Sequence, residues 1–119
     1  MSNLAKRAIA CKGWRWMPGM LQVVAPKQDG GTGCVVRYEG IAIPGAYPDL
    51  SDPATMGCLL SLVREAWGCP TAYLVHSDGL WILMRRDPMA LALCRPQMTE
   101  TEALVAALEA AERQEVKDE

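Results

Sequence analysis

The chain has 119 residues, of which half are apolar and 22% are charged, and its formal net charge is −2. This composition is typical of one globular domain over residues 1–119 and argues against disorder. The 12 basic residues are neither in excess over the 14 acidic ones nor densely clustered, which argues against a nucleic-acid-binding module. No apolar run approaches the ~20 residues that a membrane-spanning helix needs.

Five cysteines, an odd number without a C-x-x-C spacing, do not match the disulfide framework of a small secreted protein. Basic residues interrupt the N-terminal apolar stretch, so no signal peptide is expected. We therefore expect a cytoplasmic protein with reduced thiols. Cys34, Cys58 and Cys94 are expected to pack in the core, whereas Cys69, beside a proline, should be the most exposed thiol.

A short helix is predicted over residues 3–11, with Ser2 as its N-cap and Gly13 at its end. Two segments rich in β-branched and aromatic residues follow, at 21–24 and 34–39. They flank a polar, glycine-rich stretch, and together they predict a hairpin. The connector after this hairpin could hold a further short strand at 41–43.

Residues 52–68 carry a complete set of helix signals. Asp52 can act as the N-cap, and Pro53 follows at the first helical position, where its missing N–H costs nothing. Gly68 suits a left-handed C-cap and is followed by a proline that prevents continuation. Apolar residues at helical spacing predict one buried stripe: Met56, Leu59, Leu60, Val63 and Trp67.

A second hairpin is predicted from segments 71–76 and 80–85, because Ser77-Asp78-Gly79 lies between them and Asp-Gly favours a tight turn. The segment 80–85 is apolar on both faces. That is unusual for an antiparallel strand with one wet side, and it indicates a central strand, a covering layer or a dimer interface. Residues 89–94 could form an edge strand. Thr99 and Glu102 fit a capping box at the start of a helix over 100–115.

The element order is therefore α-β-β-α-β-β-α. It predicts a single α+β domain with one antiparallel sheet of about four or five strands and three helices on one face. Such a sheet leaves its second face partly open, which would suit a homodimer.

The block Asp49-Leu-Ser-Asp-Pro-Ala-Thr-Met-Gly-Cys-Leu-Leu-Ser-Leu-Val-Arg-Glu-Ala-Trp-Gly68 resembles one found in small bacteriophage and prophage proteins of unassigned function. The segments Gly13-Trp-Arg-Trp-Met-Pro-Gly-Met20 and 101–110 fit the same resemblance. It implies a phage origin and a setting in the host cytoplasm. It implies no activity and no site residues.

The residue pattern contains no catalytic constellation. His76, the only histidine, could act as a general base or pair with a thiol, but its place beside a hairpin turn favours a structural role. A zinc site would need several cysteines brought together, and short ligand spacings are absent. We therefore expect a protein that is not an enzyme and that holds neither a metal nor a cofactor.

Trp14, Arg15, Trp16 and Met17 are the best candidates for a binding surface. Two tryptophans on one strand face, with an arginine between them, could stack on a base or anchor a protein interface. Both could also pack beneath a helix as core. The remaining candidate binding residues are Met20, Arg37, Trp81 and Arg85.

These observations favour a non-enzymatic phage accessory protein that binds a host protein, such as an inhibitor of a bacterial defence system, CRISPR–Cas included. A first alternative is a protein that sequesters a small nucleotide with Trp14, Trp16 and nearby Arg15, Arg37 or Arg85. A second is a minor structural protein of the virion.

Overall fold

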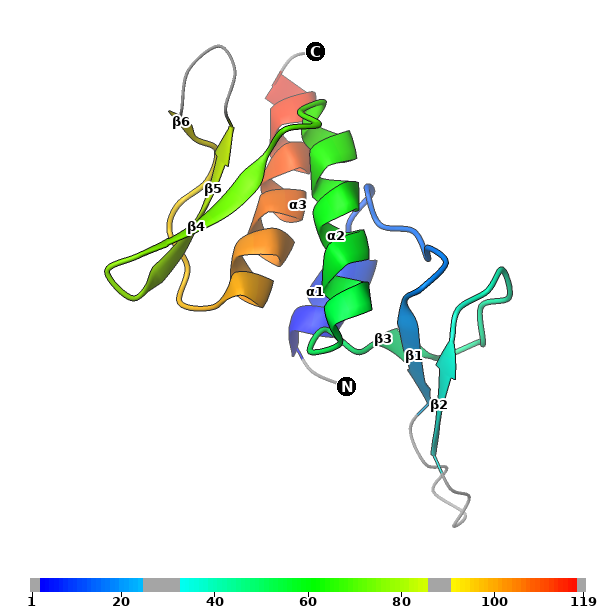
Figure 1. Cartoon of the computed structure of the whole chain (residues 1–119). Helices are drawn as coiled ribbons and strands as arrows, with labels where there is room; N and C mark the ends of the chain where they lie inside the picture. The colour runs from blue at the N-terminus through cyan, green and yellow to red at the C-terminus, as the bar shows by residue number, and fades with distance from the viewer. Residues whose placement is uncertain (1–2, 25–32, 86–90, 118–119) are drawn as a thin grey trace.

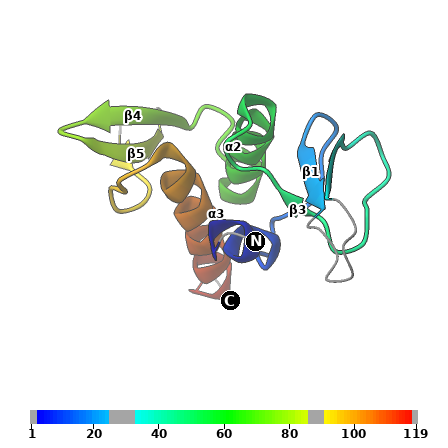
Figure 2. The same cartoon turned by 90° about the horizontal axis from the view of Figure 1, so that it is seen from below.

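The computed structural model describes residues 3–24, 33–85 and 91–117. In these residues, helices α2 and α3 lie side by side, and one three-stranded sheet lies on each side of the pair (Figures 1 and 2). This arrangement confirms the α+β class. The elements in chain order are α1 (Asn3–Ile9), β1 (Leu21–Val24), β2 (Cys34–Arg37), β3 (Tyr47–Pro48), α2 (Pro53–Trp67), β4 (Tyr73–Ser77), β5 (Leu80–Arg85), β6 (Leu91–Ala92) and α3 (Glu100–Lys117).

The core lies where α2 and α3 meet. It consists mainly of leucines and valines that are at most 1% exposed, and burial of each such side chain contributes about 1.5–3 kcal/mol. Helix α1 adds the small buried residues Ala5 and Ala8, and it packs against α3. The central members are Leu59, Leu62, Val63, Leu104, Val105 and Leu108.

The buried face of α2 differs from the predicted stripe. Leu62 and Thr55 are buried, whereas Met56, Leu60 and Trp67 are only partly buried. Because α2 meets α3 on one side and strand β1 near its first turn, its buried surface extends beyond a single stripe.

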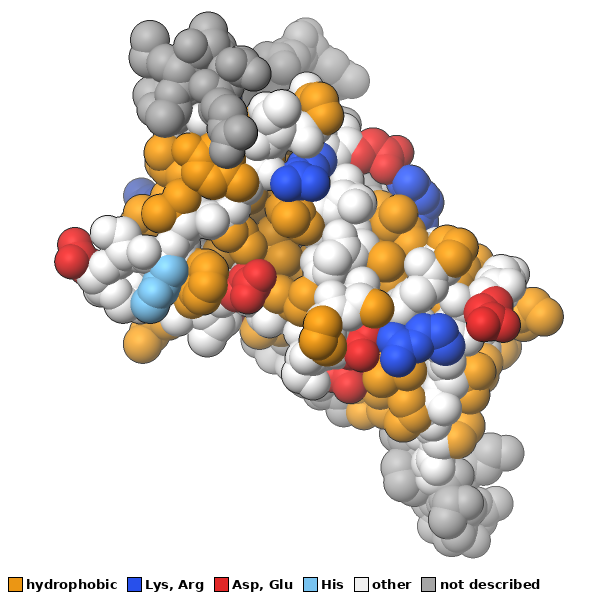
Figure 3. All heavy atoms as spheres, viewed as in Figure 1, with side chains coloured by type: hydrophobic (Ala, Val, Ile, Leu, Met, Phe, Trp, Pro, Cys, Tyr) orange, Lys and Arg blue, Asp and Glu red, His pale blue; other side chains and the backbone are white. Residues whose placement is uncertain are grey.

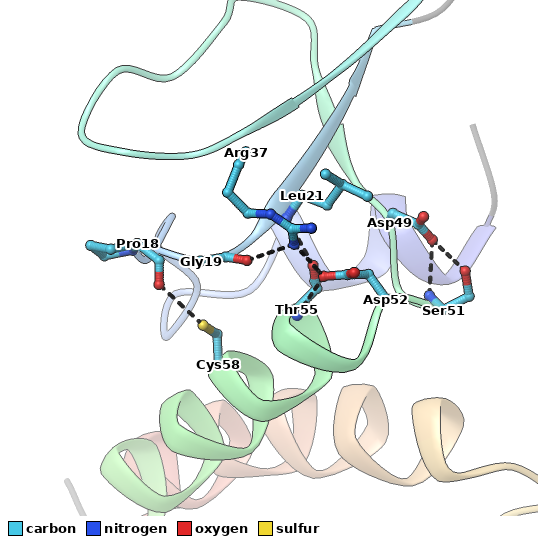
Figure 4. A network of polar contacts seen from close by, with 9 residues as sticks. All are labelled: Pro18, Gly19, Leu21, Arg37, Asp49, Ser51, Asp52, Thr55 and Cys58. Atoms are coloured by element: carbon cyan, nitrogen blue, oxygen red, sulfur yellow. Dashed lines mark hydrogen bonds and ion pairs between the residues drawn. The ribbon is translucent and has the colours of Figure 1, made fainter.

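The first turn of α2 is fixed by a polar network around Asp52, the predicted N-cap (Figure 4). The Asp52 carboxylate accepts hydrogen bonds from the Thr55 amide at 3.0 Å and the Thr55 hydroxyl at 2.9 Å. The Thr55 hydroxyl in turn accepts from the Leu21 amide at 2.8 Å, and the Arg37 guanidinium lies 2.7 Å from Asp52. The cap therefore joins the helix to both β1 and β2.

The other end of α2 also matches its prediction. Gly68 takes the left-handed conformation with φ of 63°, and its amide bonds back to the last turn of the helix. The Cys69 amide donates to the Arg64 carbonyl at 2.9 Å, which completes a glycine C-cap.

The first sheet has the order β2-β1-β3 and is antiparallel throughout. The predicted strand at 41–43 does not form. Instead, the buried side chain of Gln22 bonds to this segment. Its Nε2 donates to the Ile41 carbonyl at 3.2 Å, and its Oε1 accepts from the Ile43 main-chain N–H at 2.8 Å. Its side chain thus takes the hydrogen bonds that a strand partner would offer, and β3 forms later. Cys34, predicted to be buried, is exposed because β2 is an edge strand with all four residues exposed.

The second sheet has the order β4-β5-β6. Its turn residues Asp78 and Gly79 have φ of 54° and 78°, as the two central residues of a type I′ hairpin require. The two predicted hairpins are thus confirmed, but the single sheet that was expected to join them is wrong. Each hairpin instead gains its own short third strand, and the helix pair separates them.

The start of α3 confirms the predicted capping residue, since the Thr99 hydroxyl accepts from the Glu102 amide at 3.0 Å. Farther along, the Arg7 guanidinium ties α1 to α3 through two hydrogen bonds to Glu109, at 3.1 and 2.6 Å. None of the helices in the described ranges combines the length and the hydropathy needed to cross a bilayer.

Two glycines of α2 provide a paired stability test. Ala in place of Gly57, a helix-interior position with open space around its Cα, should stabilise the fold by about 0.5–1 kcal/mol. Ala in place of Gly68 should destabilise it by about 1 kcal/mol or more, because φ of 63° is strained for a residue with a Cβ. Urea unfolding of Gly57→Ala and Gly68→Ala measures both. Changes of the same sign would contradict the assigned helix end.

Acid should destabilise the protein through two carboxyl groups. Burial opposes ionisation of Asp52, but hydrogen bonds from Arg37 and Thr55 outweigh it, so its pKa lies below the ordinary 3.8. The hydrogen bond from Arg7 likewise lowers the pKa of Glu109 below 4.5. Both carboxyl groups have a lower pKa in the folded state than in the unfolded state. Their stabilisation is therefore fully present at pH above the unfolded-state pKa values, and it is lost as the pH falls through the folded-state pKa values.

Unfolding free energies measured across this acid range should fall less steeply with pH in the double variant Asp52→Asn/Glu109→Gln than in the native chain. Asparagine keeps the capping acceptor but does not titrate. The single variant Asp52→Ala loses both the capping acceptor and the carboxylate charge. It should therefore melt at a lower temperature than Asp52→Asn. Identical acid slopes in the double variant and the native chain would refute the role of these groups.

Candidate functional site

The predicted binding segment folds into an aromatic cluster on the surface of the helix pair. The Trp14 and Trp16 rings meet edge to face with centroids 5.5 Å apart, and Trp16 stacks on Tyr38 at 6.0 Å. Both tryptophans are half-buried and pack against the core. Much of their aromatic surface is therefore used within the chain, and only part of it remains for a partner.

The two methionines of this segment have different environments. Met20 is fully buried, so its prediction as a surface contact is wrong: it occupies the core beneath β1, and its sulfur accepts from the Met17 amide at 3.3 Å. Met17 is half-buried beside the aromatic cluster. Packing in the core is therefore sufficient to explain the methionine at position 20.

The three predicted arginines do not gather around the tryptophans, and only Arg15 lines a pocket together with Trp14. Arg15 forms an exposed ion pair with Glu65 at 2.8 Å. Arg37 is held by Asp52 and by the Gly19 carbonyl, at 2.7 and 2.9 Å. Arg85 lies on β5, in the sheet on the other side of the helix pair (Figure 1).

A pocket of about 420 Å³ lies beside Trp14, between α2 and α3. Leu62 and Leu108 are among its lining residues. Its charged residues are Lys12, Arg15, Glu65 and Glu112, two cations and two anions. The lining is thus electrostatically balanced, which does not favour a phosphate there.

The second sheet presents an uncharged apolar surface, which we call the outer face. Leu83 is 1% exposed and packs in the core, so it identifies the inner face of β5. The pairings Leu74↔Leu83 and His76↔Trp81 share that inner face, and the residues between them point the other way. The apolar side chains of the outer face are those of Tyr73, Val75, Leu80, Ile82, Met84 and Ala92, all at least partly exposed, and Ser77 shares this face.

Figure 3 shows hydrophobic side chains gathered over the β4–β5 hairpin. The alternation on β5 indicated such a surface from the sequence, but Tyr73 and Val75 of β4 were not predicted as its members. Trp81, which was predicted, lies on the inner face and stacks on His76 at 4.8 Å. It is half-buried.

Strand β4 forms an open edge of this sheet. In a hairpin with a two-residue turn, Ser77, Val75 and Tyr73 exchange hydrogen bonds with β5, so the amides and carbonyls of Leu74 and His76 point away from it. No hydrogen bond to these outward groups is found within the described ranges. The register is continuous and β4 contains neither lysine nor proline, so the usual protections of an edge strand are missing.

The side of β5 away from β4 is occupied by β6 and the segment that follows it. The Trp81 amide donates to the Gln97 carbonyl at 2.7 Å and the Gln97 amide returns a bond of 2.9 Å. The Leu93 amide donates to the Leu83 carbonyl at 2.8 Å. Of the two long strands of this sheet, β4 is therefore the one with a free row of main-chain groups in the described residues.

The thiols differ in environment. Burial raises the pKa of Cys11 to about 11, and burial also raises the pKa values of Cys58 and Cys94. Cys69 is half-buried, so its prediction as the most exposed thiol is wrong, and Cys34 is the exposed one. Over residues 3–24, 33–85 and 91–117, no three His, Cys, Asp or Glu side chains gather as a metal site would require.

Comparisons with known protein families, with curated proteins and with solved structures give no significant match to this chain. Its function is therefore inferred from its own surfaces. The open edge of β4 and the adjoining outer face form the most distinctive of them.

Proposed function

We propose that this chain is a phage accessory protein that binds a host protein, and that the partner adds an extended segment to the open edge of β4. Inhibition of a bacterial defence component is the activity that such binding would serve. The observation that carries the proposal is the unprotected edge of β4 next to an uncharged apolar face.

Strand addition would satisfy main-chain groups that β4 leaves open. The amide and carbonyl of Leu74 and of His76 could each pair with the added strand, and each such bond contributes about 0.5–1.5 kcal/mol net. Side chains on alternate positions of the partner would then lie beside Val75 on the outer face. A segment with Val, Ile or Leu at every second position suits this arrangement.

The chemistry of the surface favours a protein over nucleic acid. None of the outer-face residues is charged, whereas nucleic-acid affinity comes largely from cations that meet phosphates. The resemblance to small phage proteins supports a host component as the partner. A protein of this size can act by blocking a surface, without chemistry of its own.

A lysine in place of Val75 tests the proposal, because lysine on an edge strand is the natural guard against strand addition. Val35→Lys is the matched control, since Val35 is an exposed valine on the edge strand β2 of the other sheet. A host protein captured by the native chain should bind purified Val75→Lys about tenfold or more weakly and Val35→Lys normally, as measured by calorimetry. Expression of the native chain, but not of Val75→Lys, should relieve defence in a phage-plating assay.

Equal binding of the captured protein to Val75→Lys and to the native chain would refute the role of the β4 edge. The oligomeric state of the purified chain, measured by sedimentation, provides a second test. If the native chain is a dimer that Val75→Lys converts to a monomer, the edge receives a second copy, and the proposal of a host partner at this site is wrong.

A further inference from the structure

A second pocket, of about 310 Å³, lies between the segment after β6, helix α3 and the end of α2. Its volume is at the small end of the range for ligand sites. Unlike the balanced pocket beside Trp14, its charged residues in the described part of the chain are two arginines, Arg95 and Arg113. The described lining residues are Trp67, Leu93, Cys94, Arg95, Gln97, Ala106, Ala110 and Arg113.

Neither arginine donates a hydrogen bond or forms an ion pair that involves only described side chains. Among the side chains described over 92–113 and the earlier ranges, no carboxylate lies within ion-pair distance of Arg95 or Arg113, whereas Arg7, Arg15 and Arg37 each have one. Glu109 lies one turn before Arg113 on α3, but its carboxylate already receives two bonds from Arg7. No ion pair with a described side chain therefore holds either guanidinium group, although the Glu109 charge acts on Arg113 from one turn away.

A third guanidinium lies on the same face of the sheet. The Leu83 carbonyl accepts from the Leu93 amide, which places the pocket-lining Leu93 beside β5, and Arg85 follows Leu83 by two residues. Arg85 Nε is buried without a hydrogen-bond partner, the only such side-chain N or O atom in the described ranges. Buried donors are normally paired, so Arg85 Nε is an unsatisfied donor on the face of the sheet that carries Leu93.

The remaining lining is apolar and partly rigid. The Trp67 indole donates from Nε1 to the Ala107 carbonyl at 2.9 Å, which fixes the ring at the pocket wall. Leu93, Ala106 and Ala110 supply aliphatic surface. A flat apolar group could lie against these side chains, and the pocket has room for about one ring system rather than a dinucleotide.

We propose that this pocket binds a small organic anion, with its phosphate or carboxylate held by Arg95 and Arg113 and its flat apolar body against Trp67. Paired guanidinium groups match the geometry and charge of both oxyanions. The site lies on a different surface from the β4 edge, so it is independent of the proposed protein partner.

Titration of the isotope-labelled full chain, followed by NMR, tests this site. The probes are AMP for the phosphate class, benzoate for the carboxylate class, and adenosine as the neutral control. At least one anion should shift the Trp67 indole N–H signal saturably, and adenosine should not. Arg95→Gln and Arg113→Gln should each weaken that binding about tenfold, because a charge-assisted hydrogen bond is lost.

Arg15→Gln is the matched control, because it removes the same charge from a surface ion pair that does not line this pocket. Its affinity for the anion should equal that of the native chain. Absence of a saturable shift with both anions at millimolar concentration would overturn the proposal. So would native affinity in both pocket variants, or adenosine binding as tightly as AMP, provided that the spectra show folded protein.

Discussion

The contact between α2 and α3 is the interaction on which the rest of the structure depends. The two helices bring together six leucines and valines that are at most 1% exposed, and α1 and both sheets attach to their flanks. Gly13 shows how tightly the chain crosses this pair: a Cβ there would lie 3.0 Å from a Leu108 methyl and 3.4 Å from the Ala66 Cβ. A side chain at position 13 would require the Leu108 methyl to move by a few tenths of an ångström.

Much of the fold could be predicted because its signals are local. The cap at Asp52, the left-handed residue at Gly68 and the Asp78-Gly79 turn each depend on interactions within a few residues of sequence. The pairing of hairpins is different, because it depends on contacts across the whole chain. The buried amide of Gln22, which holds the connector at Ile41 and Ile43, has no signature in the sequence.

The candidate site was predictable only in part, for the same reason. Alternation on β5 indicates a strand that is apolar on both faces, but the identity of the outer face needs the burial of Leu83. Trp14, Arg15 and Arg37 were predicted as binding residues from their residue types alone. Their partners Trp16, Glu65 and Asp52 are revealed only by the packed structure, and they occupy much of the binding capacity that the sequence suggested.

The division into two sheets also explains which strand edges stay unpaired. In one joined sheet, at least one hairpin strand would lose its free side to a neighbour. With the helices between the hairpins, β2 and β4 both stay at edges, and β4 keeps its outward main-chain groups. The segment that follows β6 then turns back toward α3, where it forms the arginine-lined pocket.

The exposed position of Cys34 has a practical consequence. Thiolates are the reactive form of cysteine, and burial raises the pKa values of Cys11, Cys58 and Cys94 and so disfavours their thiolate forms. A maleimide dye or spin label should therefore react first at Cys34, at the end of β2. That strand belongs to the sheet across the helix pair from β4, so the unmodified chain already contains an attachment point for optical or magnetic probes that leaves the proposed contact surface unaltered.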